Sequence, residues 1–371
     1  MKTSLPRSPR TSPKPKKCSV KPDRRKTKPL SRRVWLGLLI SALFVYLALR
    51  QVDLSRMWLV IRSADPLLFC LVIGLNLFQY VIRAWRWGLL IEPIQKTVFS
   101  SRLYALLIGF AANCILPARL GEIIRANYLG QRERLSASST FGTIVVERIF
   151  DGLTLLLFLM IGLLGTTFPE EWRSVGVSLR ATGFFMLGAY GLLISFLIGF
   201  KVKAKLFLNL LDRILFLVPR TFRSRTIDIL WNFSLGLTIP KKLHHWVLVV
   251  FYSLLLWFAS LGQIKLVELS IRLDMPPIAP FLVMAMASFG VMIPSAPGFI
   301  GTFHLSVQYA YLFYGIGKEE GLSAAVLWHA SFFFPTLILG LLAFLLLHVS
   351  PSALASGPGN PKVGEEAERP G

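Results

Sequence analysis

The chain has 371 residues, of which 54% are hydrophobic and only 16% are charged, and its mean hydropathy is +0.60. A soluble domain carries far more charge, so this composition excludes an ordinary globular protein and indicates an integral membrane protein. The formal net charge of +22 would suit a nucleic-acid-binding protein. No aromatic interleaving or recognised binding fold accompanies that charge, however, so nucleic acid is not expected as a partner.

Two stretches hold most of the excess positive charge. The first 33 residues contain 13 Lys or Arg, six prolines and a single acidic residue, Asp23. Because such a segment cannot bury a core, residues 1–33 are predicted to form a disordered basic tail. Residues 201–245 contain nine Lys or Arg against Asp212 and Asp228. The positive-inside rule predicts that both stretches are cytoplasmic, where they would attract anionic lipid headgroups.

Six apolar runs are long enough, or nearly so, to cross the roughly 20-residue width of a bilayer core. They are residues 34–49, 66–91, 141–164, 182–200, 246–270 and 324–347. Two further apolar regions, residues 103–117 and 279–314, are too short or are broken in the middle, and we interpret each as a re-entrant hairpin. For the second region the alternative is a plain extracellular loop between two ordinary spans.

The expected order is the same in both halves of the chain, about residues 34–164 and 182–348, namely two spans, a hairpin and a third span. The halves would have opposite orientations, which is the inverted-repeat plan of many secondary transporters. PARLG at 117–121 and PGFIG at 297–301 share the pattern P-x-x-aliphatic-G at corresponding places. The predicted fold class is therefore an all-α polytopic membrane domain, residues 34–348, with about six full spans and two opposed hairpins, followed by a disordered tail at 349–371.

Prolines and glycines are expected to form the tips of the two hairpins. Proline ends an inbound half-helix, and glycine allows a tight turn with close backbone approach. Such a tip presents unpaired backbone N–H groups, which favour an anion or a phosphate. The predicted tip residues are Pro117, Gly121, Pro294, Pro297, Gly298 and Gly301.

Ionisable side chains inside a bilayer cost about 2.5–3.5 kcal/mol each near its centre, so they are candidates for a functional site. In the run ERIFD, Asp151 lies within one helical turn of both Glu147 and Arg148. We predict that these three residues bind substrate. An ion network that only stabilises the fold is the alternative.

A second charged group precedes this run. Arg119, Glu122 and Arg125 recur every three residues and are expected to share one helix face. Guanidinium groups next to a helix break suit a lipid phosphate, because they bind phosphate in a bidentate way. An amphipathic helix at the membrane surface would carry the same charges and is the alternative.

The second span carries a polar stripe of Asn76, Gln79, Arg83 and Arg86, spaced three, four and three residues apart. A stripe of this length is unfavourable against lipid, so it is expected to face the bundle interior or a water-filled groove. The first three residues are predicted to contribute to substrate binding. For Arg86 the preferred interpretation is that its side chain extends to the cytoplasmic surface.

His304 follows the second break, and His329 lies in the last span. Either could titrate in a proton-coupled cycle, although a packing role is the simpler alternative. The three cysteines stand alone, and we find neither a cluster of acidic residues suited to Mg²⁺ nor a nucleotide-binding loop. No metal and no cofactor are therefore expected.

Three strings, LPARLGEIIR, ERIFDGLTLLL and PSAPGFIGTFH, resemble in this order the membrane domain of lysylphosphatidylglycerol synthases, over about residues 34–348. The resemblance implies a protein that moves or binds a lipid or lipid-linked headgroup, as in the flippase half of the multiple peptide resistance factor. The residues that match the three motifs are Pro117, Arg119, Gly121, Glu122 and Arg125, then Glu147, Arg148 and Asp151, then Pro297, Gly298 and Gly301.

The chain also departs from this family. Members often carry an acidic residue after the last glycine of the third motif and an arginine in the final span, where this chain has His304 and His329. That difference leaves the preferred headgroup open. The chain ends some 24 residues after its last apolar run, so the soluble synthetase domain of the bifunctional members is not expected.

The predicted function is a flippase or transporter of a membrane phospholipid or lipid-linked headgroup, without enzyme activity. In this hypothesis the phosphate meets Arg119 and Arg125, while Glu147 and Asp151 hold those arginines or a cation of the headgroup. A membrane-embedded transferase and a regulatory scaffold are the alternatives. We expect a multi-pass protein of the cell membrane with both termini in the cytoplasm, and a partner enzyme that makes the lipid.

Overall fold

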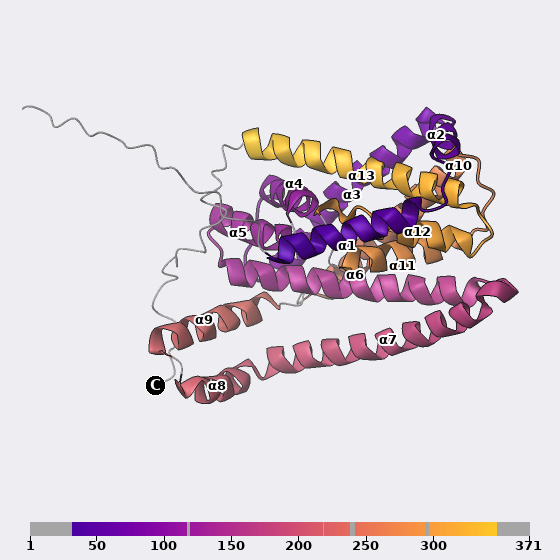
Figure 1. The fold of residues 1–371 in the computed structure, drawn as a ribbon. Helices are drawn as coiled ribbons and strands as arrows, with labels where there is room; N and C mark the ends of the chain where they lie inside the picture. Colours follow the sequence, from indigo (N-terminus) through magenta and orange to yellow (C-terminus); the bar gives the residue numbers. More distant parts are fainter. Residues whose placement is uncertain (1–31, 117–118, 218, 238–241, 294–296, 347–371) are drawn as a thin grey trace, which may run out of the picture.

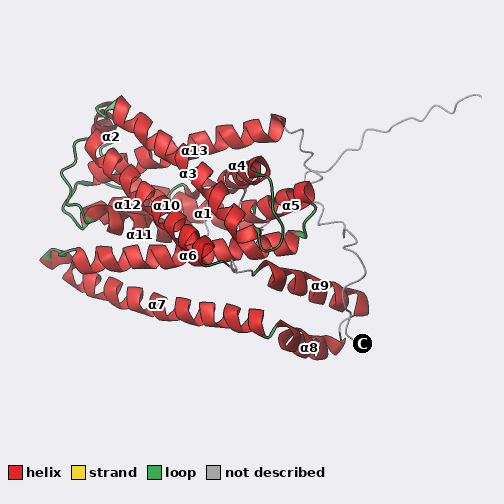
Figure 2. Ribbon diagram, turned by 180° about the vertical axis from the view of Figure 1, so that it is seen from behind, coloured by secondary structure: helices red, strands yellow, loops and turns green. Residues whose placement is uncertain are grey.

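The computed structural model describes residues 32–116, 119–217, 219–237, 242–293 and 297–346, with only the backbone of residues 32–38. Within these ranges every regular element is a helix (Figure 2). Four helical segments are long and apolar enough to cross a membrane, and they define a multi-pass membrane protein. These are α3 (Pro66–Ile91), α7 (Arg173–Val202) with the short turn η2 (Glu170–Trp172) before it, α10 (Leu243–Ser270) and α13 (Lys318–Leu346).

Two more helices coincide with predicted apolar runs. Helix α6 (Ala137–Gly165) has 29 residues but carries three charged side chains, and α1 (Arg32–Leu49) is apolar over its last turns. Each of the six runs predicted from the sequence thus lies on one long helix. The predicted all-helical fold is confirmed for the described residues.

The two interrupted regions form pairs of short helices. The members of each pair pack against each other, and the pairs lie towards opposite ends of the bundle (Figures 1 and 2). The first pair is α4 (Phe99–Ile115) and α5 (Gly121–Glu133); the second is α11 (Ala279–Met292) and α12 (Thr302–Leu312), joined in part by the turn η4 (Pro297–Phe299). Pro117 and Pro294, two of the predicted tip residues, lie outside the described residues.

Corresponding helices of the two halves make corresponding contacts. Helix α3 packs against α10, α4 packs against α13, and α11 packs against α6. Glycine allows close approach in the last two cases: a Cβ at Gly340 would lie 2.6 Å from the carbonyl oxygen of Leu107, and one at Gly162 would lie 2.8 Å from the backbone nitrogen of Leu282. The third long helix of each half therefore approaches the backbone of the first short helix of the other half closely.

The remaining helices lie at the two ends of the bundle. Helix α2 (Leu54–Arg62) lies at one end, while α8 (Ala204–Ile214) and α9 (Arg220–Gly236) lie at the other, near α5 (Figure 1). Helix α9 is attached to α6, where Ser139 Oγ donates to the Asn232 carbonyl oxygen at 2.9 Å. The short helices α8 and α9, which lie within the basic segment 201–245 predicted from the sequence, are thus at a single end of the molecule.

The start of α3 shows how the sequence sets a helix boundary. Asp65 precedes the helix in an extended conformation, and its carboxylate accepts hydrogen bonds from the backbone N–H groups of Leu67 and Leu68. Pro66 occupies the first turn, where no N–H partner is needed. This cap sets the residue at which α3 begins.

Candidate functional site

Buried charge gathers where α3, α5 and α6 meet, and Glu147 of α6 lies at its centre. The carboxylate of Glu147 accepts two hydrogen bonds from Arg125, at 2.7 and 3.2 Å, in the forked geometry that suits guanidinium and carboxylate. It also accepts a hydrogen bond from Arg148 Nη2 at 2.6 Å. Arg86 Nη2 lies 3.4 Å from the same carboxylate. One fully buried acid therefore faces three arginines.

Asp151, one turn further along α6, has a similar set of partners. Arg86 Nη1 donates to it at 2.6 Å, and Arg148 Nη2 lies 3.2 Å away. Arg83 Nη1 is the most distant partner, at 3.8 Å. Arg86 Nη1 also donates to Ser253 Oγ of α10 at 2.9 Å. We call Arg83, Arg86, Arg125, Glu147, Arg148 and Asp151 the ion network.

Two arginines of the ion network are closed to any ligand. Arg86 is 0% exposed, so the interpretation that its side chain reaches the surface is wrong. Its two acidic partners, Glu147 and Asp151, stand one turn apart on α6 and hold its guanidinium inside the bundle. Arg125 is 2% exposed and stacks on the Trp87 ring at 3.7 Å.

Two other arginines and one acid form the open edge of the same cluster. The side chain of Arg148 is 34% exposed, and those of Glu122 and Arg83 are partly exposed as well. Arg148 Nε lies 3.9 Å from Glu122 Oε1, which links the ion network to α5. A ligand could approach these groups without displacing Arg86 or Arg125.

The expectation that Arg119, Glu122 and Arg125 share one helix face is wrong for Arg119. Helix α5 begins at Gly121, whose N–H donates to Asn113 Oδ1 at 2.8 Å, so Arg119 precedes the helix. Its φ is +54°, and its side chain is exposed whereas Arg125 is buried. The helix is interrupted at this position, and the backbone conformation there directs Arg119 away from α5.

Arg119 joins the two helix pairs instead. Its Nη2 donates to the Val291 carbonyl oxygen of α11 at 3.3 Å, and its guanidinium carbon lies 5.8 Å from the centre of the Phe299 ring. Arg119 and Phe299 hold the same place in the two P-x-x-aliphatic-G segments, and both have positive φ, +54° and +60°. Corresponding residues of the two interrupted segments therefore share a conformation and contact each other.

The second interrupted segment is attached to α13 by histidine. Gly298 and Gly301 have φ values of +74° and +94°, which only glycine adopts readily. His329 Nε2 donates to the Gly298 carbonyl oxygen at 2.8 Å, and the rings of His304 and His329 lie 4.8 Å apart. Both histidines thus pack at the tip, and their titration in a transport cycle stays a prediction.

The polar stripe of α3 divides into two parts. Asn76 and Gln79 are buried, as expected, but in the described structure neither forms a hydrogen bond with the ion network. Gln79 Nε2 donates to Ser260 Oγ of α10 at 2.9 Å. These two residues fasten α3 within the bundle, while Arg83 and Arg86 belong to the ion network. Sequence reasoning missed Ser253, whose signal is a small polar residue within an apolar span.

Within the described part of the chain, no group of three or more His, Cys, Asp or Glu side chains is placed to hold a metal ion. The chemistry that the site offers is electrostatic. It combines preorganised guanidinium groups, a partly exposed carboxylate and the meeting point of two broken helices.

The fold and this buried charge define a helical membrane protein whose candidate site lies where α3, α5 and α6 meet, beside the contact between its two interrupted segments. The chain belongs to the family described as the lysylphosphatidylglycerol synthase TM region, whose model matches residues 34–340. The family suggested by the three sequence strings is thereby confirmed.

Curated relatives are distant. The chain is 24% identical to the Glycosyltransferase AglD of Haloferax volcanii. The match covers 86% of this chain but only 56% of the relative. It is 26% identical to a UPF0104 membrane protein of Pyrococcus horikoshii, covering 83% of this chain and 96% of the relative. A third relative, a UPF0104 membrane protein of Methanothermobacter thermautotrophicus, is 23% identical over 72% of this chain and 81% of its own.

Proposed function

We propose that the protein moves a phosphate-bearing amphiphile, a phospholipid or a lipid-linked headgroup, between the two leaflets, and that it catalyses no bond cleavage or transfer. The observation that carries this proposal is the arginine-rich ion network beside the contact between the two interrupted segments. Ionisable groups within membrane-spanning helices are costly and commonly mark a substrate path.

The proposal includes a topology of six spans and two re-entrant hairpins arranged as an inverted repeat. Its support is the placement of the helix pairs towards opposite ends of the bundle, together with the matching packing of the two halves (Figure 1). The end that carries α8 and α9 would be cytoplasmic, because their segment is rich in Lys and Arg. Both chain termini would then lie on that side of the cell membrane.

The charge of the site favours an anionic headgroup. Four arginines pair with three carboxylates, and Arg119 adds a fifth positive charge nearby, which leaves a surplus of two positive charges. The residues counted are Arg83, Arg86, Arg119, Arg125 and Arg148 against Glu122, Glu147 and Asp151. A phosphate would compensate that surplus, and guanidinium is the side chain best shaped to bind it.

Residue roles follow from exposure. Arg148 and Arg119 are the groups that would touch the phosphate, because both are accessible, and no described residue accepts a hydrogen bond from Arg148 Nη1. Arg125 and Arg86 would position Glu147 and Asp151 rather than bind the ligand. Glu122 would meet a cationic part of the headgroup, and the acyl chains would stay in the membrane.

Access to the site would alternate as the two halves rock against each other. The contacts that Arg119 makes with Val291 and Phe299 would have to open for a headgroup to pass between the interrupted segments. Ligand binding can favour one arrangement only through a difference in affinity between the two. An ion gradient or a partner protein would supply energy for uphill movement, and a partner enzyme would supply the lipid.

The test is leaflet exchange by the purified full-length chain in liposomes that contain headgroup-labelled lipids. The panel covers anionic, zwitterionic and polyprenyl-phosphate lipids. We expect Arg148→Gln and Arg119→Gln to lower exchange at least about tenfold, the loss of one charge-assisted hydrogen bond or more. Arg173→Gln is the matched control, because Arg173 is an exposed arginine paired only with Glu170 in the described structure. Exchange no faster than in empty vesicles for every lipid would overturn the proposal.

Topology is tested separately by labelling single cysteines. A cysteine at position 119 should react from the side of α8 and α9 when the hairpins are re-entrant, and a cysteine at 299 from the opposite side. Labelling of both positions from one side only would contradict the inverted-repeat arrangement.

A membrane-embedded transferase is the second candidate, because the relative AglD is named a glycosyltransferase. The chain spans only 56% of that relative, so the named activity can reside in the part that this chain does not match. Glu147 and Asp151 are both paired with arginines, which leaves Glu122 as the accessible acid of the site. A new lipid mass after incubation with sugar donors would support the transferase. A regulatory scaffold would instead show no loss of function in Arg148→Gln.

A further inference from the structure

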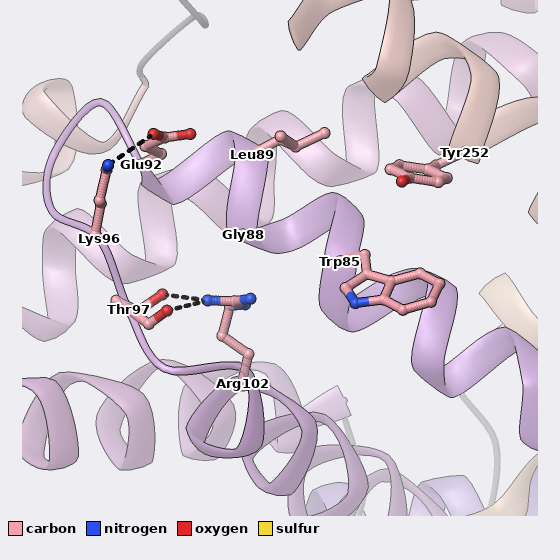
Figure 3. Close-up of a pocket in the computed structure, with 8 residues that line it drawn as sticks. All are labelled: Trp85, Gly88, Leu89, Glu92, Lys96, Thr97, Arg102 and Tyr252. Carbon is pink, nitrogen blue, oxygen red and sulfur yellow. Dashed lines mark hydrogen bonds and ion pairs between the residues drawn. The ribbon is translucent and has the colours of Figure 1, made fainter.

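A cleft of about 420 Å³ lies beside the C-terminal part of α3, where Trp85, Gly88, Leu89 and Glu92 line it (Figure 3). Trp85 lines this cleft and is half-exposed, while its neighbour Arg86 is fully buried in the ion network. The other walls come from α10, from α4 and from the connection between α3 and α4. The cleft lies near the C-terminal end of α3, so it is distinct from the site between the interrupted segments.

Arg102 of α4 is built into one wall with its guanidinium held in place. It is 9% exposed; its Nε donates to the Ala84 carbonyl oxygen at 2.9 Å, and its Nη1 donates to Thr97 Oγ1 at 2.9 Å and to the Thr97 carbonyl oxygen. Gly88 makes room for it, because a Cβ there would lie 2.8 Å from Nη2.

The remaining nitrogen of Arg102 is available to a ligand. No described residue accepts a hydrogen bond from Nη2, and Figure 3 shows this end of the guanidinium turned away from Thr97, beneath Gly88. The Arg102 side chain is nine-tenths buried, and its Nη2, which has no partner among the described residues, is left to meet a ligand or water. Because the group is a fixed guanidinium, a phosphate or carboxylate oxygen is the partner that binds it best.

Other residues of the cleft add a second charge and an apolar side. Lys96 is exposed and lies 4.0 Å from Glu92, whose carboxylate also lies 3.7 Å from His245 Nε2. Across the cleft, the rings of Trp85 and Tyr252 lie 6.5 Å apart (Figure 3). Tryptophan and tyrosine near the end of an apolar helix are typical of the level of lipid headgroups.

We propose that this cleft binds the headgroup of a zwitterionic glycerophospholipid from the leaflet next to α8 and α9. Its phosphate meets Arg102 and Lys96, and its ammonium group meets Glu92. Trp85 and Tyr252 flank the glycerol and the first acyl carbons, while the chains run along the apolar outer face of α3 and α10. A purely anionic lipid brings a second negative charge close to Glu92, whereas the ammonium group of a zwitterionic lipid is attracted to it, which selects for the amine.

The bound lipid is a structural partner and not the transported substrate. Trp85 directly precedes Arg86 in the sequence, and Tyr252 directly precedes Ser253. Arg86 and Ser253 are in contact, because Arg86 Nη1 donates to Ser253 Oγ at 2.9 Å. A lipid that clamps Trp85 to Tyr252 would therefore also hold α3 against α10 where that contact forms. Binding is measurable without any transport assay.

Native mass spectrometry of the delipidated full-length chain tests the proposal, with phosphatidylethanolamine titrated against phosphatidylglycerol. Lys96→Gln and Trp85→Ala change exposed or half-exposed side chains, so they report on binding even when Arg102→Gln does not fold. We expect each to weaken phosphatidylethanolamine binding about tenfold, the effect of one charge-assisted contact or one aromatic wall. Lys205→Gln, an exposed lysine on α8, is the matched control and should bind normally.

Two further arms identify the ligand source and its headgroup. Glu92→Gln should bring phosphatidylglycerol to the affinity of phosphatidylethanolamine, whereas water-soluble phosphoethanolamine should not compete with the lipid. Competition by phosphoethanolamine or inorganic phosphate at equal concentration would show a site for free anions and overturn the lipid assignment. Unchanged lipid binding in Lys96→Gln and Trp85→Ala would also overturn it. Normal binding by Arg148→Gln separates this cleft from the proposed transport site.

Discussion

Replacing Glu147 with glutamine tests whether the ion network is charged in the folded protein. Three arginine nitrogens lie 2.6, 2.7 and 3.4 Å from its carboxylate. Each such pair, with charges about 4 Å apart, is worth roughly 4 kcal/mol at an effective dielectric constant near 20. Desolvation offsets most of this attraction, and breaking a buried pair by removing one partner has a net cost of about 3–5 kcal/mol. We expect Glu147→Gln to lower the free energy of unfolding by that amount.

The assay is unfolding of the purified protein in mixed micelles of mild detergent and dodecyl sulfate, followed by circular dichroism. The double variant Glu147→Gln, Arg125→Met should recover about half or more of the loss, because replacing a buried ion pair by apolar groups is often nearly neutral. Glu170→Gln is the control, since it breaks an exposed pair worth about 0–1 kcal/mol. A loss below about 1 kcal/mol for Glu147→Gln would refute the reasoning, because it would mean that this carboxylate is not ionised in the folded state.

Three further predictions concern packing, capping and the two tips. Gly162→Ala should lower the free energy of unfolding by about 1–3 kcal/mol, because the added Cβ would meet the backbone of α11. Gly188→Ala is the control, because a Cβ there would meet nothing within 4 Å. Equal effects of the two substitutions would contradict the close helix contact. Asp65→Ala should lower the free energy of unfolding by about 1 kcal/mol through loss of the α3 cap, and an unchanged unfolding curve would argue against that cap. Cysteines replacing Arg119 and Phe299 in a cysteine-free background should be joined by a short crosslinker, and a failure to crosslink would place the tips apart.

The sequence predicted the positions of the long helices well because the bilayer imposes a minimum apolar length. Runs such as 66–91 and 246–270 coincide with α3 and α10 at nearly every residue. The short helix pairs were also anticipated, since proline and glycine interrupt apolar stretches there. These are local properties, so they can be predicted from neighbouring residues in the sequence.

Partners across the bundle could not be predicted in the same way. Arg86 has the same local surroundings as a residue that reaches the membrane surface, and only the position of α6 shows that Glu147 and Asp151 face it. Arg119 was assigned to a helix face by its spacing, but the conformation of the chain break directs it to Val291 and Phe299. Side-chain direction at a break depends on tertiary contacts that one-dimensional spacing does not contain.

The order of charges along the chain has a consequence for how the protein is made. Arg83, Arg86 and Arg125 leave the ribosome before Glu147 and Asp151, the acids that neutralise them in the folded state. An unpaired arginine costs about 2.5–3.5 kcal/mol at the centre of a membrane-spanning helix, so α3, which carries Arg83 and Arg86, inserts at a loss. That loss is recovered only when α6 emerges from the translocon. The first half of the nascent chain is therefore most vulnerable to quality control in the interval before Glu147 and Asp151 arrive.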